Sequence, residues 1–251
     1  MSKREIPVLM YHQFLNEKKE NTKIETFVTA KQFEKQLQVL KFLGYETITF
    51  KDLEKIGLEN RFKKKYIIIT VDDGYKNNYD IMFPILKKYN MKAVIFLVSD
   101  LDYNKWDVEK YGEDKLLLMS ENEIKEMIKS ELIEFGGHTS THCDFHKVDR
   151  KIAEEEIYKN KKKLEEKYNI SLTTFAYPYG HLNEQVKNIV KKAGYTFAVS
   201  TDTGTGFIPD DLYEIRRSGI DKTSWFDFIR KISFKYSGYK GNKWKKHRRK
   251  I

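Results

Sequence analysis

Short apolar runs rich in β-branched residues alternate with amphipathic helical segments along most of the chain. The apolar runs have strand length and include residues 7–11 (PVLMY), 66–71 (YIIITV), 93–98 (AVIFLV) and 173–177 (TTFAY). Helical patterns lie between them, such as residues 30–43, where Thr29 is a suitable N-cap and Gly44 a suitable end. Strands separated by helices form parallel β-α units, and seven or eight units in about 240 residues predict a distorted (β/α)7–8 barrel.

The 251-residue chain divides into one expected domain, residues 1–235, and a basic tail, residues 236–251. The formal net charge is +10, but residues 239–251 contain seven Lys or Arg and no acidic residue, so the tail holds most of the excess. We expect a solvated appendage. Contact with an anionic membrane and non-specific nucleic-acid binding are the alternatives. No nucleic-acid fold motif accompanies the tail, so we expect no nucleic-acid partner.

The composition excludes several classes of protein. Hydrophobic residues form 40% of the chain, enough for a sizeable core, and the single cysteine, Cys143, excludes an internal disulfide. The apolar stretch IPVLMY near the start is too short for a secretory leader, and no run approaches the ~20 apolar residues of a membrane span. We therefore expect a cytoplasmic protein, with peripheral membrane contact or secretion after loss of a leader as alternatives. The oligomeric state stays open.

Functional groups of parallel barrels collect where strands end, and three strand ends of this chain carry polar residues. The first is TVDDG, residues 70–74, in which Asp72 and Asp73 follow an apolar strand. Adjacent side chains of a regular strand point to opposite faces, so both carboxylates reach one site only if Gly74 lets the chain turn. One carboxylate could then bind a cation while the other accepts a proton from water that the cation activates. An ordinary turn or helix N-cap is the alternative.

The second strand end is GGHTSTH, residues 136–142. His138 and His142 are four residues apart, so a helical turn would place both imidazoles on one face, where they could share a cation. His146 repeats the spacing. Surface histidines in a loop are the alternative interpretation.

The third strand end is FAYPYG, residues 175–180. Pro178 restricts Tyr177 to an extended conformation, which would fix the backbone N–H of Tyr179 as a rigid oxyanion donor. An ordinary strand-ending turn is the alternative. Residues 101–118 have the pattern of a long irregular loop, in which Tyr103 and Trp106 could stack on sugar rings or simply pack.

These motifs, in this order, resemble the NodB-homology polysaccharide deacetylases (carbohydrate esterase family 4). TVDDG, HTSTH and FAYPYG look like the first three motifs of that family, and the resemblance runs from residue 8 to about residue 232. It implies that Asp72 is the general base and that Asp73, His138 and His142 bind a divalent metal. An Asp-His-His set leaves positions open for water and substrate, as a catalytic site requires. We expect Zn²⁺, with Co²⁺, Mn²⁺, Ni²⁺ and Fe²⁺ as alternatives.

Two departures from the family pattern point to one of its branches. The third motif often begins with an Arg that orients the base, where this chain has Ala176; the last motif often supplies a late His, where residues 213–220 contain none. Both changes resemble the branch that acts on poly-β-1,6-N-acetylglucosamine. We hypothesise that Arg216 or Arg217, preferably Arg217, supplies the missing guanidinium beside Asp72.

The general acid and the substrate contacts follow less directly from the motifs. His12, at the end of the first strand, and His146 are candidates for the acid, and a hydrogen-bonded residue of the barrel rim is the alternative role of His12. We assign Tyr177, Pro178 and His12 to substrate binding. Arg217 and Tyr179 join Asp72 in the expected catalytic set.

The resemblance implies a metal-dependent hydrolase that removes N-acetyl groups from an N-acetylated sugar or polysaccharide. The metal would polarise the acetamide carbonyl, Asp72 would take a proton from the attacking water, and the Tyr179 N–H would bind the oxyanion. The expected partner is thus a carbohydrate that contains N-acetylglucosamine or is linked to a lipid. An O-acetyl esterase, a deformylase of a lipid-linked amino sugar and a catalytically silent carbohydrate-binding barrel are the alternatives.

Overall fold

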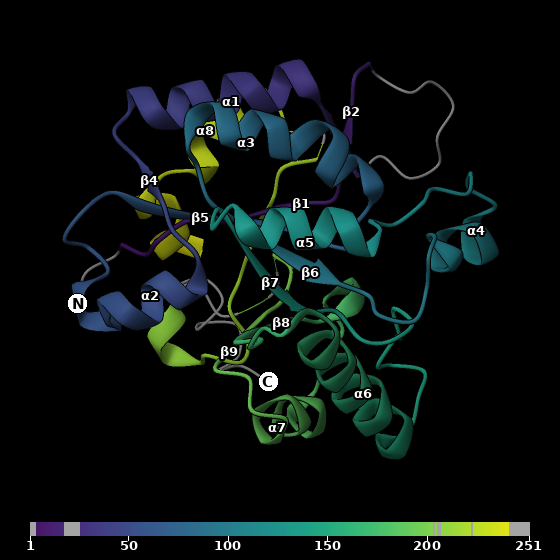
Figure 1. Ribbon diagram of the computed structural model, residues 1–251. Coiled ribbons are helices and arrows are strands. Elements are labelled where there is room, and N and C mark those ends of the chain that lie inside the picture. The colour runs from purple at the N-terminus through teal and green to yellow at the C-terminus, as the bar shows by residue number, and fades with distance from the viewer. Residues whose placement is uncertain (1–3, 18–25, 203, 205–206, 222, 241–251) are drawn as a thin grey trace.

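The computed structural model describes residues 4–17, 26–202, 204, 207–221 and 223–240, and Figure 1 shows how its elements are arranged. Parallel strands form one curled sheet in the order β10-β1-β5-β6-β7-β8-β9, and β4 pairs with the first half of β5. The strands of this sheet are β1 (Val8–Tyr11), β4 (Glu46–Thr47), β5 (Tyr66–Val71), β6 (Ala93–Leu97), β7 (Ile133–Gly137), β8 (Thr174–Ala176), β9 (Phe197–Val199) and β10 (Ser218–Gly219).

The curled sheet closes on itself just before β10. Ile215 forms a parallel bridge with Val199 of β9, and β10 then pairs with β1, with Leu9 opposite Ser218. The distorted barrel expected from the alternation of strands and helices is thereby confirmed. A separate parallel pair, β2 (Gln13–Leu15) with β3 (Phe27–Thr29), was not predicted and lies outside the barrel sheet.

Helices cover the outside of the sheet (Figure 1). α1 packs with α3, and α6 packs with α7 at the other end of the sheet. The helices are α1 (Ala30–Phe42), α2 (Phe50–Ile56), α3 (Phe83–Tyr89), α4 (Lys105–Tyr111), α5 (Glu121–Lys129), α6 (Arg150–Tyr168), α7 (Glu184–Lys192) and α8 (Trp225–Lys231). Short helical turns span Leu58–Asn60, Asn78–Met82, Pro178–Gly180 and Ile208–Asp210. Among the described helices, none has the length and apolar character needed to span a bilayer.

Strand β5 shows how the core directs polar groups to the barrel interior. All six of its residues are buried, as expected of a parallel strand covered on both faces. Ile67 and Ile69 belong to the apolar cluster under the helices, whereas Ile68 belongs to a second cluster of inward-facing side chains. Because side chains alternate along a strand, Asp72 continues the inward row of Ile68 and Thr70.

The predicted helix start at Thr29 is confirmed at the level of side-chain contacts. Thr29 caps α1 and forms a capping box with Gln32. Ser120 caps α5 and forms the same kind of box with Glu123. Each pair satisfies backbone groups that a helix end leaves without partners.

The interpretation of residues 101–118 as an irregular loop is wrong, because this segment contains α4. The segment is organised by Asn104, whose side chain accepts a hydrogen bond from the Leu116 N–H at 2.7 Å and donates one to the Asp114 carbonyl at 3.1 Å. These partners lie ten and twelve residues away, beyond the range of a helical pattern. At the carboxyl end of the chain, residues 234–240 are helical, and the rest of the predicted basic tail lies outside the described residues.

Candidate active site

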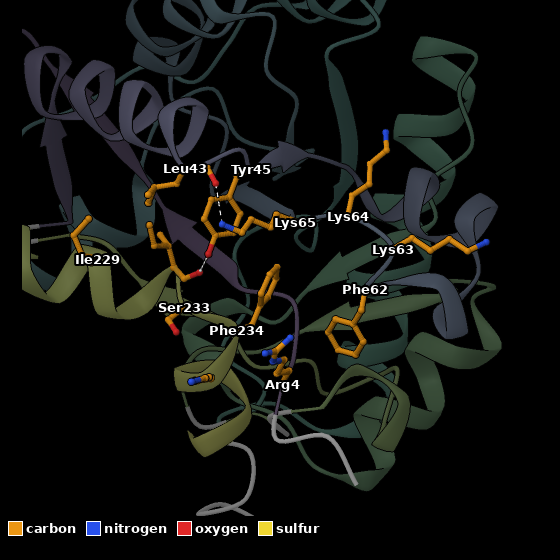
Figure 2. Close-up of a pocket in the computed structure, with 12 residues that line it drawn as sticks. Arg4, Leu43, Tyr45, Phe62, Lys63, Lys64, Lys65, Ile229, Ser233 and Phe234 are labelled. Atoms are coloured by element: carbon orange, nitrogen blue, oxygen red, sulfur yellow. Dashed lines mark hydrogen bonds between the residues drawn. The ribbon is translucent and has the colours of Figure 1, made fainter.

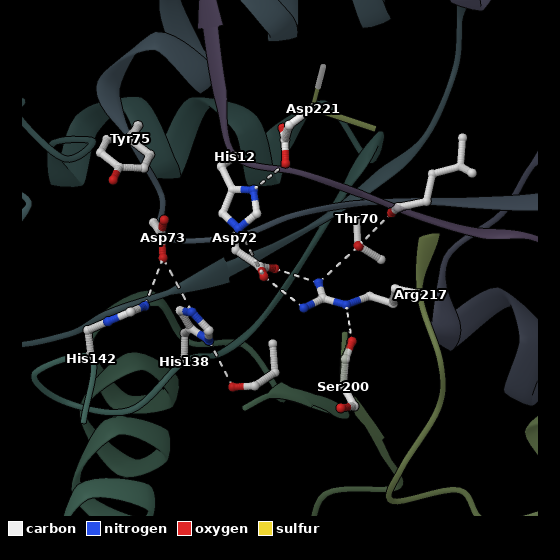
Figure 3. A network of polar contacts seen from close by, with 12 residues as sticks. His12, Thr70, Asp72, Asp73, Tyr75, His138, His142, Ser200, Arg217 and Asp221 are labelled. Atoms are coloured by element: carbon white, nitrogen blue, oxygen red, sulfur yellow. Dashed lines mark hydrogen bonds and ion pairs between the residues drawn. The ribbon is translucent and has the colours of Figure 1, made fainter. Parts of the chain in front are cut away.

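The three polar strand ends meet at the carboxyl edge of the barrel, where they line a pocket of about 340 Å³. The turn after β5 contributes Asp72 and Asp73, the loop after β7 contributes His138 and His142, and the segment after β8 contributes Tyr179. Figure 3 shows the carboxylates and imidazoles pointing toward one another. Strand ends far apart in sequence meet here because neighbouring parallel strands end at the same edge.

A reversal of the backbone at Asp73 and Gly74 allows both carboxylates to face the pocket. Both residues have left-handed backbone angles, with φ of 76° at Asp73 and 77° at Gly74. A Cβ at position 74 would lie 2.7 Å from Leu97 Cδ2, so glycine is favoured by space as well as by φ. The turn that the sequence required of Gly74 is therefore present.

Asp73, His138 and His142 form a compact set of donor atoms. Asp73 Oδ1 lies 3.3 Å from Nε2 of each imidazole, and the three donor atoms are all within 4.8 Å of one another. Asp73 Oδ1 is buried and has no hydrogen-bond partner among the described residues. A buried carboxylate oxygen without a hydrogen bond is costly unless a cation lies against it. Two imidazoles and one carboxylate therefore fit a divalent metal with open positions.

Neighbouring groups orient the two imidazoles. His138 Nδ1 lies 2.8 Å from the Ala176 carbonyl, which leaves Nε2 to face Asp73. The His142 ring stacks on Trp106 of α4, with centroids 4.3 Å apart, and meets the Tyr179 ring edge-on at 4.7 Å.

Protonation in this cluster favours metal binding. Burial alone would raise the pKa of Asp73, but the neighbouring imidazoles hold it well below its usual value. Burial lowers the pKa of His142, although Asp73 opposes this shift. An ionised carboxylate and a neutral imidazole are the forms that bind a metal.

The two histidines converge without the helical turn that their spacing suggested. Residues 138–142 are not helical, and Thr139 and His142 have left-handed φ values of 64° and 60°. The Thr139 hydroxyl accepts a hydrogen bond from the Cys143 N–H at 3.0 Å. Asn160 of α6, fully buried, donates to the Thr139 carbonyl at 2.6 Å. The sequence analysis did not identify Asn160, which lies in a helix of mostly charged residues.

Arg217 lies against Asp72 in a bidentate ion pair. Its Nη1 is 2.6 Å from Asp72 Oδ1 and its Nη2 is 2.7 Å from Oδ2 (Figure 3). Burial raises the pKa of Asp72, but the Arg217 guanidinium outweighs this effect and keeps the pKa below its usual value. Arg216 instead pairs with Asp202, so the two arginines have different partners.

His12 lies between the carboxylates of Asp72 and Asp221. Its Nδ1 is 3.3 Å from Asp221 Oδ2 and its Nε2 is 3.8 Å from Asp72 Oδ2. Burial lowers the pKa of His12, but the nearby charge of Asp221 outweighs this effect and raises the pKa to about 9. Asp221 was not predicted, although it follows β10 and the strand-end rule could have identified it.

The remaining predicted residues have separate surroundings. Tyr177 lines the pocket, but its hydroxyl donates to the Tyr213 carbonyl at 2.8 Å. Pro178 is buried beside Tyr179, whose backbone has a left-handed φ of 60°. His146, a candidate for the general acid, does not line the pocket. Its ring stacks on His181 with centroids 4.0 Å apart, and His181 pairs with Asp144.

Helix α4 supplies one wall of the pocket, and Trp106, one of the two aromatic residues expected to contact sugar rings, lines it. Asp107 and Tyr111 also line the pocket, whereas Tyr103 does not. The Asp107 carboxylate accepts a hydrogen bond from the Tyr75 hydroxyl at 2.8 Å. Burial, reinforced by the charge of Asp73, raises the pKa of Asp107 to about 6.

Several known proteins are similar to this chain over most of its length. The family model described as polysaccharide deacetylase matches residues 59–198. The chain belongs to the polysaccharide deacetylase family. The members of this family are carbohydrate deacetylases, hydrolases acting on carbon–nitrogen bonds, and the resemblance to NodB-homology enzymes is thereby confirmed.

Three relatives of this polysaccharide deacetylase are informative. It is 30% identical over 210 residues to the poly-β-1,6-N-acetyl-D-glucosamine N-deacetylase of Staphylococcus aureus, covering 74% of this chain and 69% of that protein. The solved structure of the Bacillus cereus polysaccharide deacetylase BC0361 is similar with a TM-score of 0.74 and 32% identity, over 91% of this chain and 69% of that one. The Streptococcus pyogenes deacetylase PplD, in complex with acetate, is similar with a TM-score of 0.77 and 26% identity, over 91% and 98% of the two chains.

Proposed function

We propose that this protein is a metal-dependent deacetylase that removes N-acetyl groups from a polymer of N-acetylglucosamine. The observation that carries the proposal is that a set of metal ligands and a candidate base lie in one pocket. Asp73, His138 and His142 provide donor atoms for a cation. The ionised Asp72 lies beside them and forms a bidentate ion pair with Arg217. A cation site next to a carboxylate base suits hydrolysis of an unreactive amide.

Asp73, His138 and His142 would hold the divalent metal, with Zn²⁺ preferred for a site of two imidazoles and one carboxylate. When bound, the metal supplies Lewis-acid polarisation of the acetamide carbonyl and makes a nearby water more acidic.

Asp72 acts as the general base. Its carboxylate takes a proton from the attacking water, and Arg217 keeps it ionised and fixed in orientation by two hydrogen bonds. Arg217 thereby takes the part of the Arg that Ala176 replaces in the third motif.

His12 is the general acid in this proposal. Its raised pKa keeps the imidazole protonated at neutral pH, and Asp221 orients it toward the pocket. It donates a proton to the leaving amine nitrogen while acetate forms, as a histidine placed opposite a base can do. The Tyr179 N–H would bind the oxyanion of the tetrahedral intermediate.

Two features support a polymeric sugar as substrate. The pocket is open and has aromatic walls in Trp106 and Tyr111, and flat apolar rings pack against the CH groups of a pyranose. The Staphylococcus aureus relative is named for action on poly-β-1,6-N-acetyl-D-glucosamine.

Acetate release from β-1,6-linked and β-1,4-linked N-acetylglucosamine oligomers tests the proposal, together with metal analysis of the purified protein. We expect about one metal per chain and preferential turnover of the β-1,6 oligomer. Asp72→Asn should retain the metal and lose about 10²-fold or more in kcat. His138→Ala should lose the metal as well. Full turnover in Asp72→Asn would refute its role as base.

A further inference from the structure

A groove of about 500 Å³ opens at the edge of the barrel opposite the active site. Figure 2 shows the side chains that line it. Its lining includes Arg4, which precedes β1, Tyr45, which precedes β4, and residues 63–65, which precede β5. Five residues at and after the end of α8 also line it: Ile229, Ile232, Ser233, Phe234 and Lys235. Asp72 follows the other end of β5, so the groove and the catalytic pocket lie at opposite ends of one strand.

All the charged side chains that line this groove are basic. Five basic residues and no acidic residue line it: Arg4, Lys63, Lys64, Lys65 and Lys235. Lys64 pairs with Glu46 at 2.8 Å. Within the described part of the chain, Arg4, Lys63 and Lys235 have no ion-pair contact with a carboxylate.

Three exposed apolar side chains line the same groove, and two more are close to these along α1 and α8. Leu43, Phe62 and Ile229 line it with exposed fractions of 36%, 37% and 39%. Phe42, next to Leu43, is 88% exposed, and Phe226, one helical turn before Ile229 on α8, is 79% exposed. Exposed apolar groups that cluster in this way mark a binding surface more often than isolated ones do.

We propose that this basic-aromatic face, formed by the five basic residues above with Phe42, Leu43, Phe62, Phe226 and Ile229, docks the protein on an anionic phospholipid membrane. Cations attract lipid phosphates, and exposed phenyl and aliphatic groups enter the boundary between headgroups and acyl chains. A soluble anion would use the cations but would leave the apolar rim in water. The combination therefore favours a lipid surface, and docking there leaves the opposite active-site edge open. This inference does not depend on the proposed deacetylation.

Flotation with lipid vesicles tests the proposal. The full-length protein should bind vesicles that contain about 30% phosphatidylglycerol and not vesicles of pure phosphatidylcholine. Lys63→Glu/Lys235→Glu should weaken binding about 25-fold or more, because each basic residue near an anionic surface contributes about fivefold. Phe226→Ser should weaken binding several-fold without changing the net charge.

The control matches the change in charge at another face. Lys162→Glu/Lys192→Glu, on α6 and α7, also lowers the net charge by four and should bind nearly as well as the wild type. All variants should keep their unfolding midpoint and their acetate release from a soluble substrate, because none of these positions lines the catalytic pocket.

Four results would overturn the proposal. They are an equal loss of binding in the control variant, wild-type binding to neutral vesicles, complete competition by inorganic phosphate, and loss of binding only when residues 241–251 are removed. The last two results would assign the interaction to a soluble-anion site or to the basic tail instead of this face.

Discussion

Replacing Arg217 by Met removes the guanidinium beside Asp72 but retains a long apolar side chain. Arg217 is fully buried, and besides its two bonds to Asp72 it donates to the Ser200 carbonyl at 2.7 Å and to the Thr70 hydroxyl at 3.1 Å. Asp72 is itself only 4% exposed. The substitution therefore leaves the buried Asp72 carboxylate without its bidentate partner.

The expected cost is large for a single substitution. Removing one partner of a buried ion pair destabilises a protein by about 3–5 kcal/mol. The folded-state pKa of Asp72 lies below its unfolded value. This contribution to stability is therefore present above about pH 4 and is lost as the pH falls through the folded pKa. Adding Asp72→Asn removes the unpaired charge and should restore at least about 2 kcal/mol.

Urea unfolding at neutral pH, followed by far-UV circular dichroism, measures these differences. Arg216→Met is the matched control: its partner Asp202 is 58% exposed, so its loss should cost about 1 kcal/mol or less. The reasoning is refuted if Arg217→Met is no less stable than Arg216→Met. It is also refuted if the double variant Arg217→Met/Asp72→Asn is no more stable than Arg217→Met alone.

Three further predictions follow from single contacts. Asp221→Asn removes the charge that raises the pKa of His12, so the alkaline limb of the kcat profile should move to lower pH; an unmoved limb would contradict His12 as the acid. Gly74→Ala should lower the free energy of unfolding by about 1–3 kcal/mol, because position 74 has a positive φ and an added Cβ would lie too close to Leu97. Urea unfolding measures this change, and an unchanged free energy of unfolding would contradict the prediction. Thr29→Ala should cost about 1 kcal/mol in the same assay, whereas Thr29→Ser should cost little because it retains the capping hydroxyl.

Local patterns were sufficient to predict the barrel. A run such as Tyr66–Val71 is long enough for one buried strand, and a cap such as Thr29 begins a helix through contacts within three residues. Such signals depend on a few neighbouring residues, so they can be recognised without tertiary structure. They failed for α4, which depends on contacts of Asn104 ten or more residues away.

The candidate site was predicted in part for the same reason. The rule that polar groups follow strand ends identified the carboxylates and the histidines, but the helical turn that the spacing of His138 and His142 allows is absent. Two left-handed residues, Thr139 and His142, bend that loop, and the buried Asn160 binds its backbone. Nothing in the spacing of the histidines indicates this bend.

By itself, the sequence determined the order of strands and helices and the residue types available at each strand end. Only the tertiary structure decided which of two adjacent arginines pairs with Asp72, across 145 residues of sequence. Residues 216 and 217 have equal charge and similar propensities, so the sequence supported a preference for Arg217 but could not decide between the two. Residues 215–219 pair with β9 at Ile215 and with β1 at Ser218 and Gly219. Side chains alternate along this segment, so Arg217 points into the barrel while Arg216 pairs with Asp202. That orientation exists only once the sheet has closed.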